Sequence, residues 1–278
     1  MSTAGSPLLG TFETSVSRLT EVPAAQRRAF LDLKLTAQGH ADAFSRVAAF
    51  RQVETGGAVT VPPAGGALRV AAWNLERCLF PDLAARILRE HGVHLALLTE
   101  MDLGMLRTGQ VHTTRRVAEQ MGQRYAYGLE FLELLPMPPP PGFPIVGTGN
   151  DLGFHGNSLM GAVALERPAV IRLDEVADWY AAPKGGQRRI GNRMAVIATV
   201  ATGATRFVAC SVHLESASEG DGRATQMRTL LDAVDTYADG LPVLIGGDLN
   251  SHVGPGGHDD PAEPLFALAK QRGYDFGA

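Results

Sequence analysis

Residues 243–250 read VLIGGDLN, and this stretch decides how the rest of the chain is interpreted. Four apolar residues, 243–246, predict a buried β-strand that continues through Gly247 into Asp248 and Asn250. In an extended chain, residues two apart point the same way, so this carboxylate and this amide are predicted to face one site. The paired glycines leave space for another backbone or a ligand to approach closely.

Other apolar segments of the chain also end on polar side chains. These side chains are Asn74 after ALRVAAW, Glu100 and Asp102 in VHLALLTEMD, and His213 in SVHL. One such residue is unremarkable, because polar residues are common where a strand meets a turn. Their joint occurrence predicts a single rim of amide, carboxylate and imidazole groups. The same spacing argument places Glu76 beside Asn74 and Asp102 beside Glu100.

The order of strand and helix patterns predicts a mixed α/β fold. A doubly wound parallel sheet would have a helix between nearly all strands, whereas this chain has two predicted hairpins. We expect them to turn near Arg167-Pro168 and at Thr202-Gly203. Amphipathic helices are predicted in PDLAARILREHG (81–92), HTTRRVAEQMG (112–122) and ATQMRTLLDAVDTYADG (224–240).

The first 66 residues differ from the rest. Apolar residues at spacings of three and four predict helices in 18–35 and 39–54, and the Gly/Pro-rich stretch 56–66 reads as a linker. We therefore expect a helical appendage over 1–66 and the main domain over 67–278.

The composition excludes several classes of protein. The 278 residues are 45% hydrophobic with a net charge of −4, so no global basic field points to nucleic acid. Two cysteines, Cys78 and Cys210, are too few for a disulfide scaffold and are expected to be reduced. No apolar run is long enough to cross a membrane, and the N-terminus lacks a signal peptide. We expect a cytoplasmic location.

Five motifs occur in a fixed order: AWNLE (72–76), LALLTEMD (95–102), GNSLMG (156–161), SVHLES (211–216) and IGGDLN (245–250). Together they resemble the successive motifs of the endonuclease/exonuclease/phosphatase superfamily, which has the DNase I-like fold. The resemblance implies a four-layer α/β sandwich, in which two packed mixed sheets are flanked by helices.

The resemblance also implies roles for individual residues. A divalent cation, Mg²⁺ or Mn²⁺, would bind Glu100, with Asn74 and, by the spacing argument, Glu76 beside it. Asp248 would orient or deprotonate the attacking water, and His213 would donate to a phosphoryl oxygen. It also assigns Asn250 to the phosphate or the catalytic network and Asn157 to the substrate. Apart from the resemblance, His155 beside Asn157 and Arg193 in the basic segment GGQRRIGNR are candidates for substrate contact.

This chemistry is reasonable without the family name. Hydrolysis of a phosphate ester needs a positioned water and donors or cations that stabilise charge on the phosphoryl oxygens. Oxygen ligands suit a hard cation, and the zinc patterns CxxC and HExxH are both absent from the sequence. We expect a metal-dependent phosphoesterase acting on nucleic acid, a nucleotide or a phospholipid head group. The alternative is a catalytically inactive module that binds a phosphorylated ligand or a protein partner.

One family feature is missing from the sequence. The family pattern closes with a Ser-Asp-His strand end, and no SDH follows Asn250. HDD, residues 258–260, has similar residue types in a different order, and we expect a domain truncated at its C-terminus. Weaker candidates for the cleft are Arg188 and Arg189, which precede Arg193, and Arg223 and Gln226 in the following helix.

Overall fold

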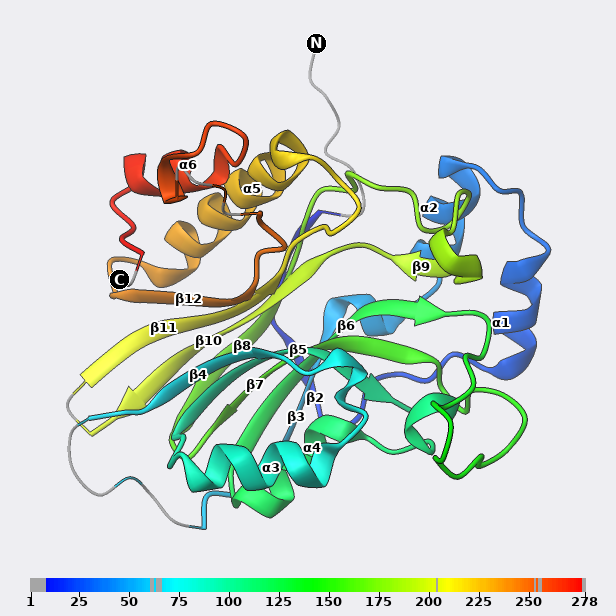
Figure 1. Ribbon diagram of the computed structural model, residues 1–278, viewed down its shortest axis with the longest axis horizontal. Coiled ribbons are helices and arrows are strands. Elements are labelled where there is room, and N and C mark those ends of the chain that lie inside the picture. Colours follow the sequence, from blue (N-terminus) through cyan, green and yellow to red (C-terminus); the bar gives the residue numbers. More distant parts are fainter. Residues whose placement is uncertain are drawn as a thin grey trace.

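The computed structural model describes residues 9–60, 63, 67–203, 205–252, 254 and 257–276. Two β-sheets pack face to face, and helices cover their outer faces (Figure 1). The predicted fold class, a layered sandwich of two mixed sheets flanked by helices, is therefore confirmed.

The first sheet has five strands. Its order is β1 (Gly10–Phe12), β8 (Ala164–Arg172), β10 (Met194–Thr202), β11 (Thr205–His213) and β12 (Val243–Asp248). All pairs are antiparallel except β11 and β12, which run parallel so that His213 lies opposite Asp248. In the described part of the chain, β12 is an edge strand.

The second sheet has seven strands. Its order is β2 (Thr14–Val16), β3 (Gln52–Gly57), β6 (Arg124–Glu133), β7 (Phe154–Gly161), β5 (Leu95–Leu103) and β4 (Val70–Asn74), with β9 (Arg189–Gly191) added to β6. Strands β4 and β5 run parallel, and Asn74 lies opposite Thr99. Both sheets thus have a parallel pair at one edge, with polar residues at the carboxyl ends.

Helices cover each sheet according to their apolar faces. The outer face of the second sheet packs against α3 (Pro81–Glu90) and α4 (Thr113–Met121). The first sheet packs against α5 (Gly220–Ala238) and α6 (Leu265–Gln271) (Figure 1). The predicted apolar face of α5 is buried in full: Met227, Leu230, Leu231, Val234 and Tyr237.

The core between the sheets is made of alternating side chains from both. Leu97 and Leu159 of the second sheet meet Val196 and Ala198 of the first. Because side chains alternate along a strand, one set fills this layer and the other set meets the helices. The two cysteines are buried free thiols, as expected.

The expectation for residues 1–66 needs correction. The segment does contain α1 (Ala24–Leu31) and α2 (Ala37–Ser45), but β1 pairs in the first sheet and β2 and β3 pair in the second. Part of the segment that reads as helix is strand β3, because Val53 fills the core between the sheets. The segment is therefore built into the sandwich. Of the expected linker 56–66, residues 56–57 belong to β3, and 61–62 and 64–66 lie outside the described residues.

One predicted hairpin turn is also displaced. Strands β7 and β8 turn at residues 162–163, and Arg167-Pro168 lies inside β8. The ladder to β10 shifts register there, and Arg167 has φ 49°. A bulge tolerates a proline that cannot donate a ladder hydrogen bond. The turn expected at Thr202-Gly203 lies between β10 and β11, as predicted.

Within the described residues, no helix combines the length and the apolar character needed to cross a bilayer.

Candidate functional site

Three polar side chains meet where the edges of the two sheets come together. The Asn74 side-chain amide donates to Glu100 Oε1 at 3.0 Å and to Asp248 Oδ2 at 2.7 Å. Asn74 ends β4, Glu100 belongs to β5, and Asp248 ends β12, so one amide links carboxylates from both sheets. The sequence prediction that these residues share a rim agrees with their positions.

Glu100 reaches this rim through a local irregularity of β5. The residue has φ 57°, and the ladder between β5 and β7 shifts register between Leu98 and Met101. Every other residue of β5 is buried, whereas the Glu100 side chain is 20% exposed. The bulge turns a single carboxylate out of an otherwise buried strand.

Asn250 fixes one oxygen of the Asp248 carboxylate. Its backbone N–H donates to Asp248 Oδ1 at 2.8 Å, and its side-chain amide donates to Leu214 O at 2.9 Å. The Leu214 N–H donates to Asp248 O at 2.9 Å. One Asp248 oxygen is thus fixed by Asn250 and the other by Asn74, which leaves the carboxylate with a defined orientation.

His213 lies beside this group and is held from behind. Its Nε2 is 4.0 Å from Asp248 Oδ2, and its Nδ1 is 3.2 Å from Glu130 Oε2. Arg193 Nη1 lies 2.8 Å from Glu130 Oε1 and 2.9 Å from His213 Nδ1. Glu215 binds the other side of the same guanidinium, at 3.2 Å from Nε.

Glu130 and Glu215 were missed by the sequence prediction. Glu130 sits inside the strand segment RYAYGLEFLEL, where two acidic residues, Glu130 and Glu133, in an apolar strand were the available signal. Its charge is fully buried, and burial alone would raise its pKa. The cations His213 and Arg193 outweigh burial and hold the pKa of Glu130 far below its usual range.

Electrostatics at the rim keep Glu100 ionised. Burial alone would raise its pKa, but His155, His213 and the Asn74 amide together lower the pKa below the usual value. Arg77 Nη1 is 3.8 Å away from Glu100 Oε2, a distance too long for a hydrogen bond. Glu100 therefore presents a charged, partly open oxygen.

Glu76 lies away from this group. The extended chain ends at Asn74, and Glu76 has φ 47° and is exposed. The Asn74 side-chain oxygen accepts the Glu76 backbone N–H at 2.9 Å, so Asn74 turns its NH₂ toward the carboxylates. The expectation that Glu76 faces the metal with Asn74 stays a prediction, and the alternation on which it rested stops one residue earlier.

Asp102 and His155 belong to a buried ion network with Arg107 and Glu133. Arg107 donates twice to Asp102, at 2.7 and 2.8 Å, and its Nη1 lies 2.6 Å from Glu133. His155 Nδ1 is 2.8 Å from Asp102 Oδ1. Asp102 is enclosed, so the spacing argument that put it beside Glu100 at the rim fails at the bulge. His155 acts on Glu100 through its charge from inside the fold.

The other predicted substrate contacts are also internal. Asn157 is fully buried and donates to Met194 O at 3.2 Å, while its own side-chain oxygen has no partner. Arg193 is 4% exposed, and its guanidinium forms ion pairs with Glu130 and Glu215. Neither is positioned for direct contact with a substrate, contrary to expectation.

The remaining cleft candidates have structural partners. Arg188 donates to Leu31 O at 2.7 Å and so fastens the N-terminal segment, and Arg189 pairs with Glu133. The other two are internal as well: Arg223 pairs with Glu263, and Gln226 accepts the Glu215 N–H. His258 of the HDD stretch packs on Phe266 and Phe276 and lines a pocket of about 490 Å³ with Asp248 and Asn250.

The residues present fit a hard divalent cation. The carboxylates of Glu100 and Asp248 converge on one amide, and their side chains are 20% and 27% exposed. Among the described residues, no group of three His, Cys, Asp or Glu side chains could hold a metal ion. Mg²⁺ is commonly held by one or two carboxylates and completes its shell with water and substrate oxygens, which this donor set allows.

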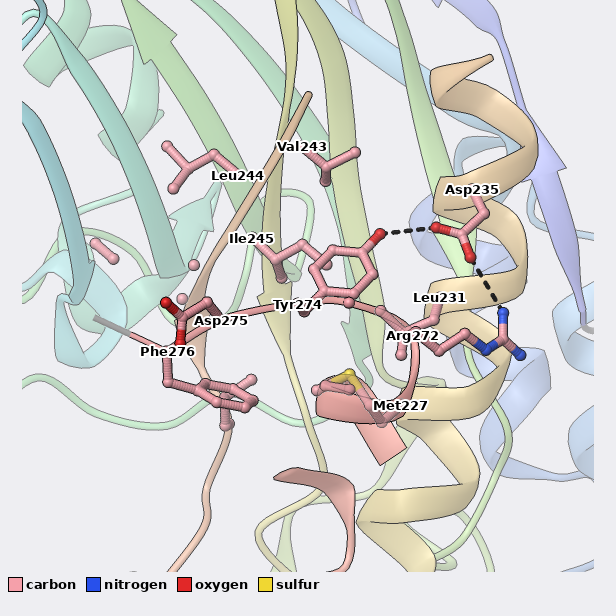
Figure 2. Close-up of a pocket in the computed structure, with 16 residues that line it drawn as sticks. Met227, Leu231, Asp235, Val243, Leu244, Ile245, Arg272, Tyr274, Asp275 and Phe276 are labelled. Atoms are coloured by element: carbon pink, nitrogen blue, oxygen red, sulfur yellow. Dashed lines mark hydrogen bonds and ion pairs between the residues drawn. The ribbon is translucent and has the colours of Figure 1, made fainter. Parts of the chain in front are cut away.

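A larger groove lies next to the site but does not contain its carboxylates. It has a volume of about 590 Å³ and runs along the free edge of β12, between Ala72 and the segment after α6. Figure 2 shows Tyr274 and Arg272 of that segment directed at Asp235, at 2.8 and 3.1 Å. The walls of this groove are mostly apolar, and the polar groups suited to catalysis lie at the rim instead.

The fold and the rim define a two-sheet α/β sandwich with a carboxylate–amide–imidazole group at the meeting point of its sheets. No family model and no curated protein matches the chain. Solved structures do resemble it. An endonuclease/exonuclease/phosphatase from Beutenbergia cavernae is 20% identical over 73% of this chain and 53% of its own, with a TM-score of 0.48.

Two further structures show the same level of likeness. The catalytic domain of human Nocturnin is 17% identical over 78% of this chain and 72% of its own (TM-score 0.49). A mannosyl-6-phosphatase of Bacteroides thetaiotaomicron is 14% identical over 73% and 70% (TM-score 0.49). The chain spans about half the length of the Beutenbergia protein. A likeness of this size transfers no function to the chain.

Proposed function

We propose that this chain is a divalent-metal-dependent hydrolase of phosphate esters. The observation that carries the proposal is the Asn74 amide, which joins Glu100 and Asp248 across the two sheets at 3.0 and 2.7 Å. His213 lies at the same rim. This is the combination of acceptor, donor and cation-binding groups that attack of water on phosphorus requires.

Each side chain has a role that follows from its contacts. Asp248, oriented by Asn74 and Asn250, accepts the proton of the attacking water. His213 is 3% exposed, and Arg193 Nη1 lies 2.9 Å from its Nδ1 and 3.1 Å from its Nε2, so it acts by positioning from behind Asp248, whose Oδ2 is 4.0 Å from Nε2. Asn74 supplies a neutral N–H between the two carboxylates. Asn250 acts by positioning, since both of its hydrogen bonds stay within the protein.

Glu100 would hold Mg²⁺ or Mn²⁺. When bound there, such an ion neutralises charge on phosphoryl and leaving-group oxygens. Glu100 is suited to the task because it is ionised and partly open. Asp248 adds a second negative charge on the far side of the Asn74 amide. The phosphate ester that would bind here is from nucleic acid, a nucleotide or a phospholipid head group.

The proposal is tested by hydrolysis of bis-p-nitrophenyl phosphate with Mg²⁺, with Mn²⁺ and with EDTA. We expect metal-dependent turnover that Asp248→Ala reduces by about 10²–10⁴-fold, the usual contribution of a general base. Glu166→Gln removes a surface carboxylate far from the rim and is the matched control. Turnover unchanged in Asp248→Ala would contradict the proposal.

The alternative is a module that binds a phosphorylated ligand without turnover. It is supported by the absence of a three-ligand metal cluster among the described residues. Folded protein that binds inorganic phosphate but hydrolyses neither a diester nor a monoester, with any of the metals, would favour this alternative.

A further inference from the structure

The arginine beside the open carboxylate of the rim donates no hydrogen bond within the described part of the chain. Arg77 Nη1 lies 3.8 Å from Glu100 Oε2, and Glu100 is the one ion-pair partner of this guanidinium among the described residues. The Arg77 Nε is buried, and no described atom accepts from it. A guanidinium carries several N–H donors, and a buried donor without an acceptor is costly. Arg77 therefore keeps donors available for an acceptor from outside the fold.

Arg77 differs in this respect from Arg193, the other arginine near the site. Arg193 is 4% exposed, and both Glu130 and Glu215 pair with it. The Arg77 side chain is 27% exposed, so it can be reached from solvent. A cation that is open and lacks hydrogen bonds is suited to an anionic ligand, whereas Arg193 is already neutralised.

The turn that carries Arg77 is strained and firmly held. Glu76, Arg77 and Cys78 have φ values of 47°, 67° and 51°, a left-handed conformation that L-residues normally adopt singly. Cys78 is buried and its N–H donates to Leu75 O at 2.9 Å, while the Asn74 side-chain oxygen accepts the Glu76 N–H at 2.9 Å. Strain of this kind persists only where surrounding contacts impose it, and it clusters at binding sites. Asn74 thus fixes this turn through its oxygen and the two rim carboxylates through its NH₂.

The two oxygens of Glu100 face different groups. Oε1 accepts from the Asn74 amide at 3.0 Å, and Oε2 faces Arg77. A divalent cation held by Glu100 and the Arg77 guanidinium would repel each other unless an anion with several oxygens lies between them. A phosphoryl group has this charge and shape, and the planar guanidinium binds it through a pair of parallel hydrogen bonds.

We propose that Arg77 binds the phosphoryl group of the substrate and donates to the oxygens that stay on phosphorus during hydrolysis. The inference rests on the proposed function, because it takes the phosphate to lie at Glu100 and Asp248. Negative charge on those oxygens has to be offset by donors or cations. Arg77 supplies such a group from the open side of the rim, whereas Arg193 and His213 are enclosed behind Asp248.

The test is calorimetric titration of inorganic phosphate into the full chain with Mg²⁺. We expect Arg77→Gln to bind phosphate about 10–100-fold more weakly than the wild type, because hydrogen bonds between charged groups contribute roughly that factor. Arg77→Lys should lie between the two, since lysine keeps the charge but loses the paired geometry. Arg86→Gln is the matched control: it removes the same charge from a 61% exposed arginine of α3 and should keep the affinity of the wild type.

Melting curves separate loss of binding from loss of the fold. Because Arg77 donates no hydrogen bond to a described residue, Arg77→Gln should melt close to the wild type when phosphate is absent. Phosphate should raise the Tm of the wild type and of Arg86→Gln but not that of Arg77→Gln, since a ligand stabilises only a protein that binds it. Equal phosphate affinity in the wild type and Arg77→Gln would overturn the proposal and leave Arg77 as a counter-ion of Glu100.

Failure of the proposed function gives a different result. If phosphate binding depends on Arg77 but the wild type hydrolyses no bis-p-nitrophenyl phosphate with Mg²⁺ or Mn²⁺, the phosphate-binding role of Arg77 holds and the hydrolase is rejected. If the wild type and Arg77→Gln hydrolyse the diester with the same kcat and KM, the hydrolase holds and the role of Arg77 is rejected. A wild type that binds no phosphate also rejects the role of Arg77, whatever its turnover.

Discussion

The molecule contains two groups of charged residues that behave differently, the buried ion network around Arg107 and the open rim at Glu100 and Asp248. In the buried ion network, Arg107 lies between Asp102 and Glu133 and pairs with both, and all three side chains are at most 1% exposed. At the rim, Glu100 and Asp248 are joined only by the neutral Asn74 amide and remain partly open. Arg189 adds a second cation at 3.2 Å from Glu133, so the network neutralises its own charge, whereas the rim keeps negative charge available for a cation.

The difference separates stability from function. Loss of one partner from a buried ion pair leaves an unpaired charge in the interior, which is costly. At the rim, His155, His213 and the Asn74 amide also favour the charged form of Glu100, but its side chain is 20% exposed, so part of that charge is open to solvent and to a cation. Residue types alone would not distinguish the two groups; burial and neutralisation do.

Arg107→Met is expected to have the largest effect on the free energy of unfolding, and it tests whether the buried network differs from an exposed ion pair. The substitution leaves buried Asp102 with only His155 and buried Glu133 with only Arg189 as ion-pair partners, and we expect a loss of about 3–5 kcal/mol in the free energy of unfolding. Urea unfolding measures it. Arg206→Met removes the partner of Glu166 at the surface and should cost no more than about 1 kcal/mol. Similar losses in the two variants would remove the distinction between the network and a surface pair.

A smaller effect on stability is expected from Glu100→Gln. Although burial opposes its ionisation, His155, His213 and the Asn74 amide lower the pKa of Glu100, so its charge is favourable in the fold. The free energy of unfolding should therefore fall, but by less than in Arg107→Met because the side chain is partly open. The Mg²⁺ concentration for half-maximal turnover should rise by about 10–100-fold or more, since even loss of an outer partner of a metal ligand has that effect. Metal titration of turnover, paired with a thermal melt, checks both. A variant that unfolds as readily as Arg107→Met would show that Glu100 is structural.

The smallest effect concerns Glu54, an enclosed carboxylate whose ion cluster is open to solvent on its Arg115 side. Burial opposes its ionisation, but hydrogen bonds from His112 and other neighbours lower its pKa to about 2. Its folded pKa lies below the unfolded value of 4.5, so its contribution to stability is complete above about pH 4.5 and is lost as pH falls toward 2.

Unfolding followed between pH 6 and pH 2 tests this contribution. Glu54→Gln should lower stability at pH 6 and flatten the slope between pH 4.5 and 2. An unchanged slope in the variant would assign acid sensitivity to other carboxylates and would weaken the claim that enclosed carboxylates serve stability here.

Much of the fold was predictable because its signals are local. The α5 face shows a helical spacing, and the Thr202-Gly203 turn has a glycine where the chain reverses. The N-terminal strands were not predictable in this way, since a short segment such as β3 becomes a strand by pairing with β6. Its Glu54 is buried only because His112 and Arg115 come from elsewhere in the chain.

The site was predictable in part for the same reason. The sequence placed Asn74, Glu100, His213 and Asp248 at strand ends, and these residues do gather at one rim. The alternation argument for their i+2 neighbours failed at the places where the backbone leaves the extended conformation. In two of the pairs the second residue is itself left-handed: Glu76 has φ 47° and Asn250 has φ 49°. In the third pair, Asp102 follows the bulge at Glu100. A single left-handed residue inverts the side that later residues face.

By itself, the sequence determined the mixed α/β class and the polar residues at the ends of its strands, because periodicity and order along the chain are local properties; the two-sheet arrangement was expected only from the resemblance of its five motifs. Only the tertiary structure decided which polar residues remain open and which are neutralised inside. That outcome depends on partners far apart in the chain: Arg193 with Glu130, Arg107 with Glu133, and Asn74 with Asp248. Burial and charge pairing are properties of the packed molecule, and no spacing rule encodes them.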